Sequence, residues 1–200
     1  YSGTGKNPQR RWFGLRRWLG PPRVRNEWRN LQAFRVLGVP TATLVAFGLE
    51  RRFGAFIRGA LITEEIPQTT DLAQLARAGD PRLRDARWVR HVARQIADIA
   101  RRLHRAHFAH NDFKWRNLLV DGGDEPTVYL IDCPSGNHYR GAILDYRIVK
   151  DLACLDKLAR RHLSRSQRLR FYLDYVQHPR LTADDRKQIG RIVNFFAGRD

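Results

Sequence analysis

One strongly periodic helix, followed by two short strands, constrains the fold of this chain more than any other feature. Between Asp85 and His107, apolar residues recur at alternating steps of three and four, at Val89, Val92, Ile96, Ile99 and Leu103. Two strand-like runs follow at 118–120 and 128–132, joined by the turn-rich stretch DGGDEP. This order predicts an α+β domain in which a loop joins a buried helix to a small hairpin.

Further elements are predicted on both sides of this unit. Pro22 suits the first turn of a helix and Gly38 its end, and we expect the buried side to carry Val24, Trp28, Leu31 and Phe34. Strand-like runs at 41–49 and 53–66 and a short helix at 69–79 come next. After residue 132 the chain is predicted to be helical, with helix-start capping pairs at Ser164 with Gln167 and Thr182 with Asp185.

The charge of the chain bears on its partners. Lys and Arg number 37 against 20 Asp and Glu, a net charge of +17, which favours an anionic partner such as nucleic acid, a phosphorylated glycan or an acidic membrane. The only cysteines, Cys133 and Cys154, form no CxxC pair, so we expect a reducing compartment and packed thiols rather than a disulfide framework. No apolar run has the length of a membrane span.

The loop HNDFKWRN, residues 110–117, carries the chemistry that the sequence predicts. The Asp112 carboxylate can accept a proton from a substrate hydroxyl, and Lys114 can neutralise charge on a transferred phosphoryl group. Asn117 and Asp132 supply oxygen ligands of the kind that Mg²⁺ prefers. Together these residues predict phosphoryl transfer. We expect His110 to have a structural role, and His104, His107 and His110 to be helix-surface residues rather than a metal cluster.

This loop resembles the catalytic loop H-x-D-x-K-x-x-N of the protein-kinase-like superfamily, and IDCPSG resembles a variant of its D-F-G segment. Cys133 and Pro134 replace the usual Phe-Gly, and no APE-like segment follows, which argues against a eukaryotic-type protein kinase. Asp151 resembles the buried helix Asp that supports the catalytic loop in these folds. The resemblance implies a protein-kinase-like fold with a truncated N-terminal lobe at 1–66 and a mostly helical C-terminal lobe at 67–200.

Nearly the whole chain is similar to the bacterial lipopolysaccharide core kinases, through the segments RRWFGLRRWLGPPRVRNEW, LITEEIPQTTDL, HNDFKWRNLLV, YLIDCPSG and YVQHPRLTADDRKQI. The resemblance implies an ATP- and Mg²⁺-dependent kinase acting on heptose or Kdo of the lipopolysaccharide inner core. It implies a cytoplasmic location, peripheral at the inner face of the inner membrane, on an anionic surface and with no nucleic-acid partner. The sequence does not separate heptose from Kdo.

The same resemblance assigns residues to nucleotide binding. Glu27 resembles the helix Glu that pairs with a strand Lys, and Glu65 and Ile66 lie in the hinge whose backbone holds adenine. That Lys and the glycine-rich turn have no convincing counterpart here, and because the chain opens at Tyr1 and contains no Met, we expect both upstream of Tyr1. We expect the basic arm, with Arg10, Arg11, Arg16, Arg17, Trp12 and Trp18, to be attracted to an anionic glycolipid surface.

Two alternatives remain open at this point. One is a different phosphotransferase, acting on a protein or another small molecule. The other is a non-catalytic, basic binding module built on a kinase-like fold. The presence of Asp112, Asn117 and Asp132 together favours an enzyme, because a binding module does not need all three.

Overall fold

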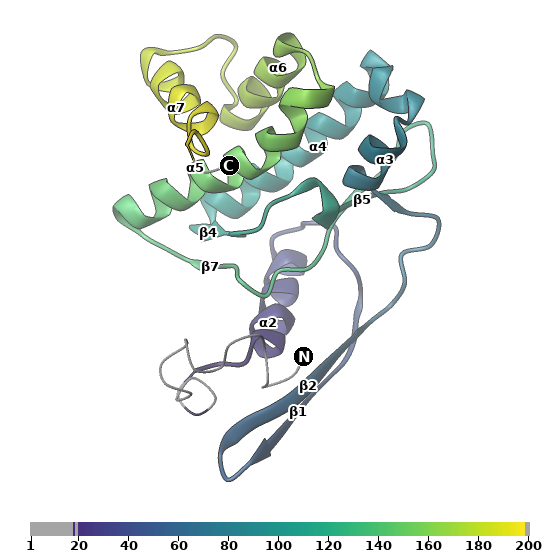
Figure 1. Ribbon diagram of the computed structural model, residues 1–200, viewed down its shortest axis with the longest axis vertical. Helices are drawn as coiled ribbons and strands as arrows, with labels where there is room; N and C mark the ends of the chain where they lie inside the picture. The colour runs from purple at the N-terminus through teal and green to yellow at the C-terminus, as the bar shows by residue number, and fades with distance from the viewer. Residues whose placement is uncertain (1–17, 19, 199–200) are drawn as a thin grey trace.

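The computed structural model describes Trp18 and residues 20–198, which form a small N-terminal part and a larger helical part (Figure 1). The N-terminal part consists of α2 (Arg23–Val36) and the antiparallel strands β1 (Leu44–Arg52) and β2 (Ala55–Thr63). The β1–β2 hairpin extends away from the helical part, beside α2. Except for Trp18, which is exposed, the named residues of the predicted basic arm lie outside the described residues.

The rest of the chain is mainly helical, with three short strand pairings. Its helices are α3 (Leu72–Ala78), α4 (Ala86–Arg105), α5 (Gly141–His162), α6 (Arg165–Val176) and α7 (Ala183–Val193), with 3-10 turns η3 (Pro81–Arg84) and η4 (Trp115–Asn117). The strands are β3 (Thr70–Asp71), β4 (Phe108–Ala109), β5 (Leu118–Val120), β6 (Val128–Leu130) and β7 (Asn137–His138), paired as β3–β5–β6 and β4–β7. The expected α+β class is therefore confirmed. The predicted lobe boundary at residue 66 stays a prediction.

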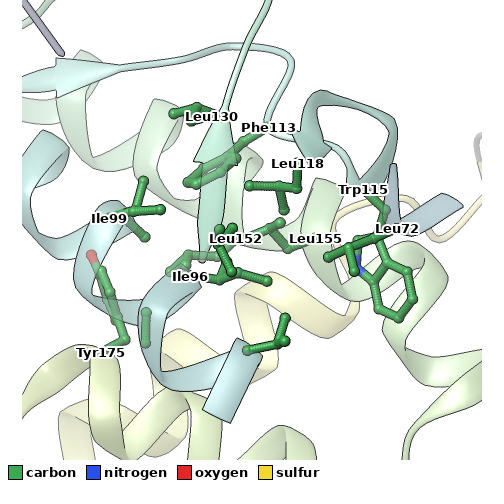
Figure 2. Close-up of a cluster of buried hydrophobic side chains, with 14 of the residues drawn as sticks. Leu72, Ile96, Ile99, Phe113, Trp115, Leu118, Leu130, Leu152, Leu155 and Tyr175 are labelled. Atoms are coloured by element: carbon green, nitrogen blue, oxygen red, sulfur yellow. The ribbon is translucent and has the colours of Figure 1, made fainter. Parts of the chain in front are cut away.

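The long periodic helix is confirmed as α4. The Asp85 carboxylate caps its first turn by accepting the Arg87 backbone N–H at 2.8 Å. All five predicted apolar residues are buried, and Figure 2 shows α4 side chains gathered with others from the β5–β6 hairpin and α5, among them Ile99, Leu118, Leu130 and Leu152. The hairpin and the loop before it thus rest on a packed base.

The second strand of the hairpin ends earlier than predicted. The sequence indicated a strand over 128–132, but β6 stops at Leu130. Asp132 has a φ of 56°, in the left-handed region that strands do not use, so the chain turns here. Asp132 therefore lies in a turn beyond the end of β6 rather than on the strand.

Helix α2 begins after Pro22 and ends before Gly38, as predicted, but its buried side differs from the expected one. Trp28 is only half-buried and stacks on Phe47 of β1, with ring centroids 5.4 Å apart. Glu27 is buried instead, with 6% of its surface exposed. The N-terminal hairpin thus takes Trp28 as a packing partner, and the helix turns a carboxylate inward.

Among the other local predictions, the capping pairs are confirmed and the strand positions differ. The predicted second strand, 53–66, is shortened to β2, and β7 precedes the helices in the segment after residue 132 that was expected to be helical. Both capping pairs form complete capping boxes at the starts of α6 and α7. The predicted first strand, 41–49, is displaced by three residues, because the turn falls at Phe53 and Gly54, which both have positive φ. No helix in the described part of the chain is both long and apolar enough to cross a membrane.

Candidate active site

A buried carboxylate on α5 holds the predicted catalytic loop. Asp151 is fully buried and accepts the backbone N–H groups of His110 and Asn111 at 2.7 and 2.8 Å. Asn111 has a φ of 66°, a left-handed conformation that Asn tolerates better than most residues. The predicted support of this loop by Asp151 is confirmed, and it fixes the backbone directly before Asp112.

The His110 ring is part of the packing beneath the loop. It lies nearly parallel to Phe34 on one side and Phe113 on the other, with ring centroids 6.0 and 5.5 Å away. Burial lowers the pKa of His110 below its ordinary value, so the ring is neutral near pH 7. Its Nδ1 atom accepts the Asp112 backbone N–H at 3.4 Å. These contacts agree with the structural role predicted for His110.

The Asp112 side chain lies between two cations. The Lys114 ammonium forms an ion pair with one carboxylate oxygen, and the Arg116 guanidinium donates to the other at 2.7 Å. Partial burial opposes ionisation, but the hydrogen bonds from Lys114 and Arg116 outweigh it and hold the pKa of Asp112 below its ordinary value. Sequence reasoning missed Arg116, although its position four residues after Asp112 lies within the loop motif. Asp112 is therefore an ionised, oriented acceptor near pH 7.

Asn117 is oriented by the loop on which it lies. Its Nδ2 atom donates to the Asp112 carbonyl at 2.8 Å, and its own carbonyl accepts the Ile131 N–H at 3.0 Å. Because the amide nitrogen faces the loop, the amide oxygen is the atom left to bind a cation. The second of these bonds also ties Asn117 to the residue directly before Asp132.

One cavity of about 520 Å³ brings together the residues predicted for nucleotide binding and Asp132. Its lining includes Glu27 from α2, Glu65 and Ile66 from the segment after β2, and Asp132. This volume is in the range of small-molecule and cofactor sites. Asp112, Lys114 and Asn117 are not among the lining residues, but the backbone hydrogen bond between Asn117 and Ile131 links the loop to the lining.

The two acidic side chains of the cavity differ in environment. Asp132 is exposed, whereas Glu27 is buried, and within the described residues the Glu27 Oε2 atom has no hydrogen-bond partner. Burial, followed by the negative charge of Asp132, raises the pKa of Glu27 to about 7. A cation placed between the two carboxyl groups would relieve both effects.

Two predictions about other side chains have opposite outcomes. His104 and His110 were both expected on a helix surface, but both are buried, and His110 lies beyond the end of α4. The His104 Nδ1 atom lies 2.9 Å from the Tyr175 hydroxyl. Helix α6 covers that face of α4, a tertiary contact that helix periodicity alone does not show. Cys133 is a packed thiol as predicted, since it is fully buried and burial raises its pKa.

Comparison with known proteins identifies relatives of this chain. The family model "Lipopolysaccharide kinase (Kdo/WaaP) family" matches residues 11–175. The lipopolysaccharide core heptose(I) kinase WaaP of Pseudomonas aeruginosa is 30% identical in an alignment of 174 residues that covers 78% of this chain and 60% of the relative. The chain thus spans about 60% of the length of that curated relative.

A solved structure supports the same relationship. The structure titled "WaaP in complex with acyl carrier protein" superposes with a TM-score of 0.65 and 26% identity, over 84% of this chain and 73% of that one. The expected protein-kinase-like fold is confirmed by this match.

Proposed function

Because the chain belongs to the lipopolysaccharide kinase (Kdo/WaaP) family, we propose that it transfers a phosphoryl group from ATP to a sugar hydroxyl of the lipopolysaccharide inner core, on heptose or Kdo. The observation that carries this proposal is the arrangement of one site. An oriented, ionised Asp112 lies on the same loop as Asn117, which is bonded to the chain directly before Asp132.

In the proposed reaction, the acceptor hydroxyl oxygen attacks the γ-phosphorus of ATP, the bond to the β–γ bridging oxygen breaks, and ADP leaves. The hydroxyl proton passes to the Asp112 carboxylate. Because its low pKa makes Asp112 a weak base, its main contribution is to orient the hydroxyl, and it takes the proton late. Lys114, paired with Asp112, lies where it can offset the negative charge of the transferred group.

The residues present fit ATP and a divalent cation. The Asn117 amide oxygen and the Asp132 carboxylate would hold Mg²⁺, which supplies positive charge to the nucleotide phosphates. The buried Glu27 carboxyl, with its raised pKa, is the kind of group that a nearby cation stabilises. The backbone of Glu65 and Ile66 would hold the adenine, in the same cavity.

The membrane contact is proposed from charge. The glycolipid acceptor would lie in an anionic bilayer surface, and Arg10, Arg11, Arg16 and Arg17 precede the exposed Trp18. Each such cation near an acidic surface contributes about 1 kcal/mol. We therefore place the protein in the cytoplasm, peripheral to the inner membrane, with no nucleic-acid partner.

An acyl carrier protein is a second proposed partner, by analogy with the solved relative. An apolar cavity of about 450 Å³ lies among α4, α5, α6 and α7, lined in part by Ile96, Leu155, Leu169, Phe171 and Ile192. Such a lining suits an acyl chain better than a polar group. A pull-down with acylated and unacylated carrier protein tests this partner, and binding that does not depend on the acyl chain would contradict the assignment of the cavity.

Phosphate transfer to defined acceptors tests the proposed function. The protein is incubated with Mg²⁺-ATP and with truncated lipopolysaccharides ending in Kdo or in heptose, and the phosphorylated position is located by mass spectrometry. We expect a new phosphate on one of these sugars. Phosphorylation of protein acceptors alone would indicate the other phosphotransferase class, and no transfer to any acceptor would favour the binding module.

A further inference from the structure

Two asparagine side chains bind three backbone carbonyls of the segment that follows Asp132. The Nδ2 atom of Asn30, on α2, donates to the carbonyls of Cys133 and Gly136 at 2.7 and 2.9 Å. The Nδ2 atom of Asn111, on the catalytic loop, donates to the Ser135 carbonyl at 2.8 Å. We call Asn30 and Asn111 the asparagine clamp.

The chemistry of the partners fixes the orientation of both amides. A backbone carbonyl only accepts hydrogen bonds, so the amide nitrogen, rather than the oxygen, must face the segment. Asn30 thereby directs both hydrogens of its NH₂ group at one short turn. A carboxylate at this position would present only acceptors to two carbonyl oxygens.

The clamp connects the two sides of the site. Asn30 follows Glu27 by three residues on α2, so the two side chains lie next to each other on one face of the helix. Asn111 directly precedes Asp112 and is itself held by Asp151. The segment 133–136 is therefore tied at one time to the helix that carries Glu27 and to the loop that carries Asp112.

The clamped segment is closed over a buried thiol. Cys133 is fully buried, and a side chain at Gly136 would collide with the Cys133 sulfur and the Phe108 ring. Asp132, directly before this turn, is held in a left-handed conformation. With no room inside the turn and three carbonyls bound, the direction in which the Asp132 carboxylate leaves the chain depends on the clamp.

We propose that Asn30 and Asn111 are positioning residues that hold segment 133–136 closed and thereby fix the Asp132 carboxylate toward the cavity. The link to catalysis rests on the proposed function of Asp132 as a metal ligand. The closure of segment 133–136 does not rest on the proposed function, because it follows from the hydrogen bonds of Asn30 and Asn111 alone. The turn after Asp132 is held closed by the two asparagine amides. A D-F-G segment would carry a mobile Phe side chain at this place.

The two cysteines provide a test that needs no enzyme activity. In a Cys154→Ser background, the rate at which a thiol reagent labels Cys133 measures opening of the segment. In a Cys133→Ser background, labelling of the buried Cys154 measures global opening. Asn30→Asp removes both donors, and Gln32→Glu, an exposed position on the same helix, makes the same chemical change away from the segment.

The loss of two hydrogen bonds to backbone carbonyls should increase the population of the open segment, and with it the labelling rate of Cys133, roughly ten- to thirty-fold. We expect that acceleration for Cys133 in Asn30→Asp, a smaller one in Asn111→Asp, and rates near those of the parent for Cys154 and for Gln32→Glu. Unchanged Cys133 labelling would overturn the proposal. Equal acceleration of Cys133 and Cys154 would also overturn it, because the side chain would then stabilise the whole fold rather than this turn.

A titration with Mg²⁺ tests the link to Asp132. Asn30→Asp should raise the Mg²⁺ concentration that gives half-maximal transfer by about ten-fold, with a smaller change in turnover at saturating Mg²⁺. An unchanged Mg²⁺ requirement in an active variant would overturn the link. If the parent protein transfers no phosphate, the proposed function fails, and the labelling rates alone decide whether the clamp exists.

Discussion

The two sides of the candidate site differ in how completely the described chain satisfies its own charges. On the catalytic loop, Asp151 accepts two backbone N–H groups and Asp112 is paired with Lys114 and Arg116. On the opposite side, the buried Glu27 carboxyl faces the negative charge of Asp132. The loop side is stabilised by contacts within the chain, whereas the Glu27 Oε2 atom has no hydrogen-bond partner within the described residues, and under the proposed function a cation would compensate the two acidic groups. We therefore expect the Mg²⁺ dependence of the proposed reaction to arise on the side of Glu27 and Asp132.

The largest expected effect is on the loop side. Asp112→Asn keeps the shape of the side chain but cannot take the hydroxyl proton, so turnover should fall by about 10²- to 10⁴-fold. Steady-state phosphate transfer at saturating ATP measures it. Turnover close to that of the parent protein would remove Asp112 from the chemistry.

The next effect concerns the anchor of the loop. Asp151→Ala leaves the backbone N–H groups of His110 and Asn111 buried without an acceptor, which should lower the free energy of unfolding by about 3 kcal/mol. Urea denaturation measures this change. Asp145→Ala, at an exposed position of the same helix, should stay within about 0.5 kcal/mol of the parent. Equal stability of the two variants would contradict the role of Asp151.

The sequence predicted the catalytic-loop side of the site better than the Glu27–Asp132 side. The spacing within residues 110–117 and the later Asp151 identified the loop side, because each residue type has a fixed place in one short motif. The burial of Glu27 was not foreseen, since helix periodicity favoured Trp28 as the inward residue. Stacking of Trp28 on Phe47 depends on a hairpin whose position in space no local pattern gives.

The same limit explains two other differences. The sequence predicts His104 on the surface because α6, which covers it with Tyr175, lies about 70 residues further along the chain. The strand ending at Leu130 looked longer because the apolar run continues to Ile131, whereas the turn at Asp132 is a backbone conformation without a sequence signature of its own. Local signals such as the capping boxes were predicted correctly because they need only a few neighbouring residues.

The smallest expected effect tests the uncompensated charge at Glu27. The pKa of Glu27 is raised from 4.5 to about 7, so the folded state holds this proton more tightly than the unfolded state. Stability attributable to Glu27 should therefore be greatest below pH 4.5 and should fall as the pH rises to about 7. Glu27→Gln should remove this loss and be more stable than the parent at pH 8, by on the order of 1 kcal/mol.

Urea denaturation at pH 5 and pH 8, without Mg²⁺, measures the effect of Glu27→Gln. Glu50→Gln, at an exposed position of the β1–β2 hairpin, is the matched control and should leave the pH dependence nearly unchanged. A parent protein that gains more stability than Glu27→Gln between pH 5 and pH 8 would show that the two acidic groups are already compensated.

The most direct test of the difference between the two sides is equilibrium binding of Mg²⁺ with a non-hydrolysable ATP analogue, measured by calorimetry. Asp132→Asn should weaken this binding by about ten-fold or more, because it removes the anionic ligand proposed for the cation. Asp112→Asn should leave the affinity within about two-fold of the parent, because its loss appears only in the transition state. Equal weakening by both variants, or by neither, would contradict the account.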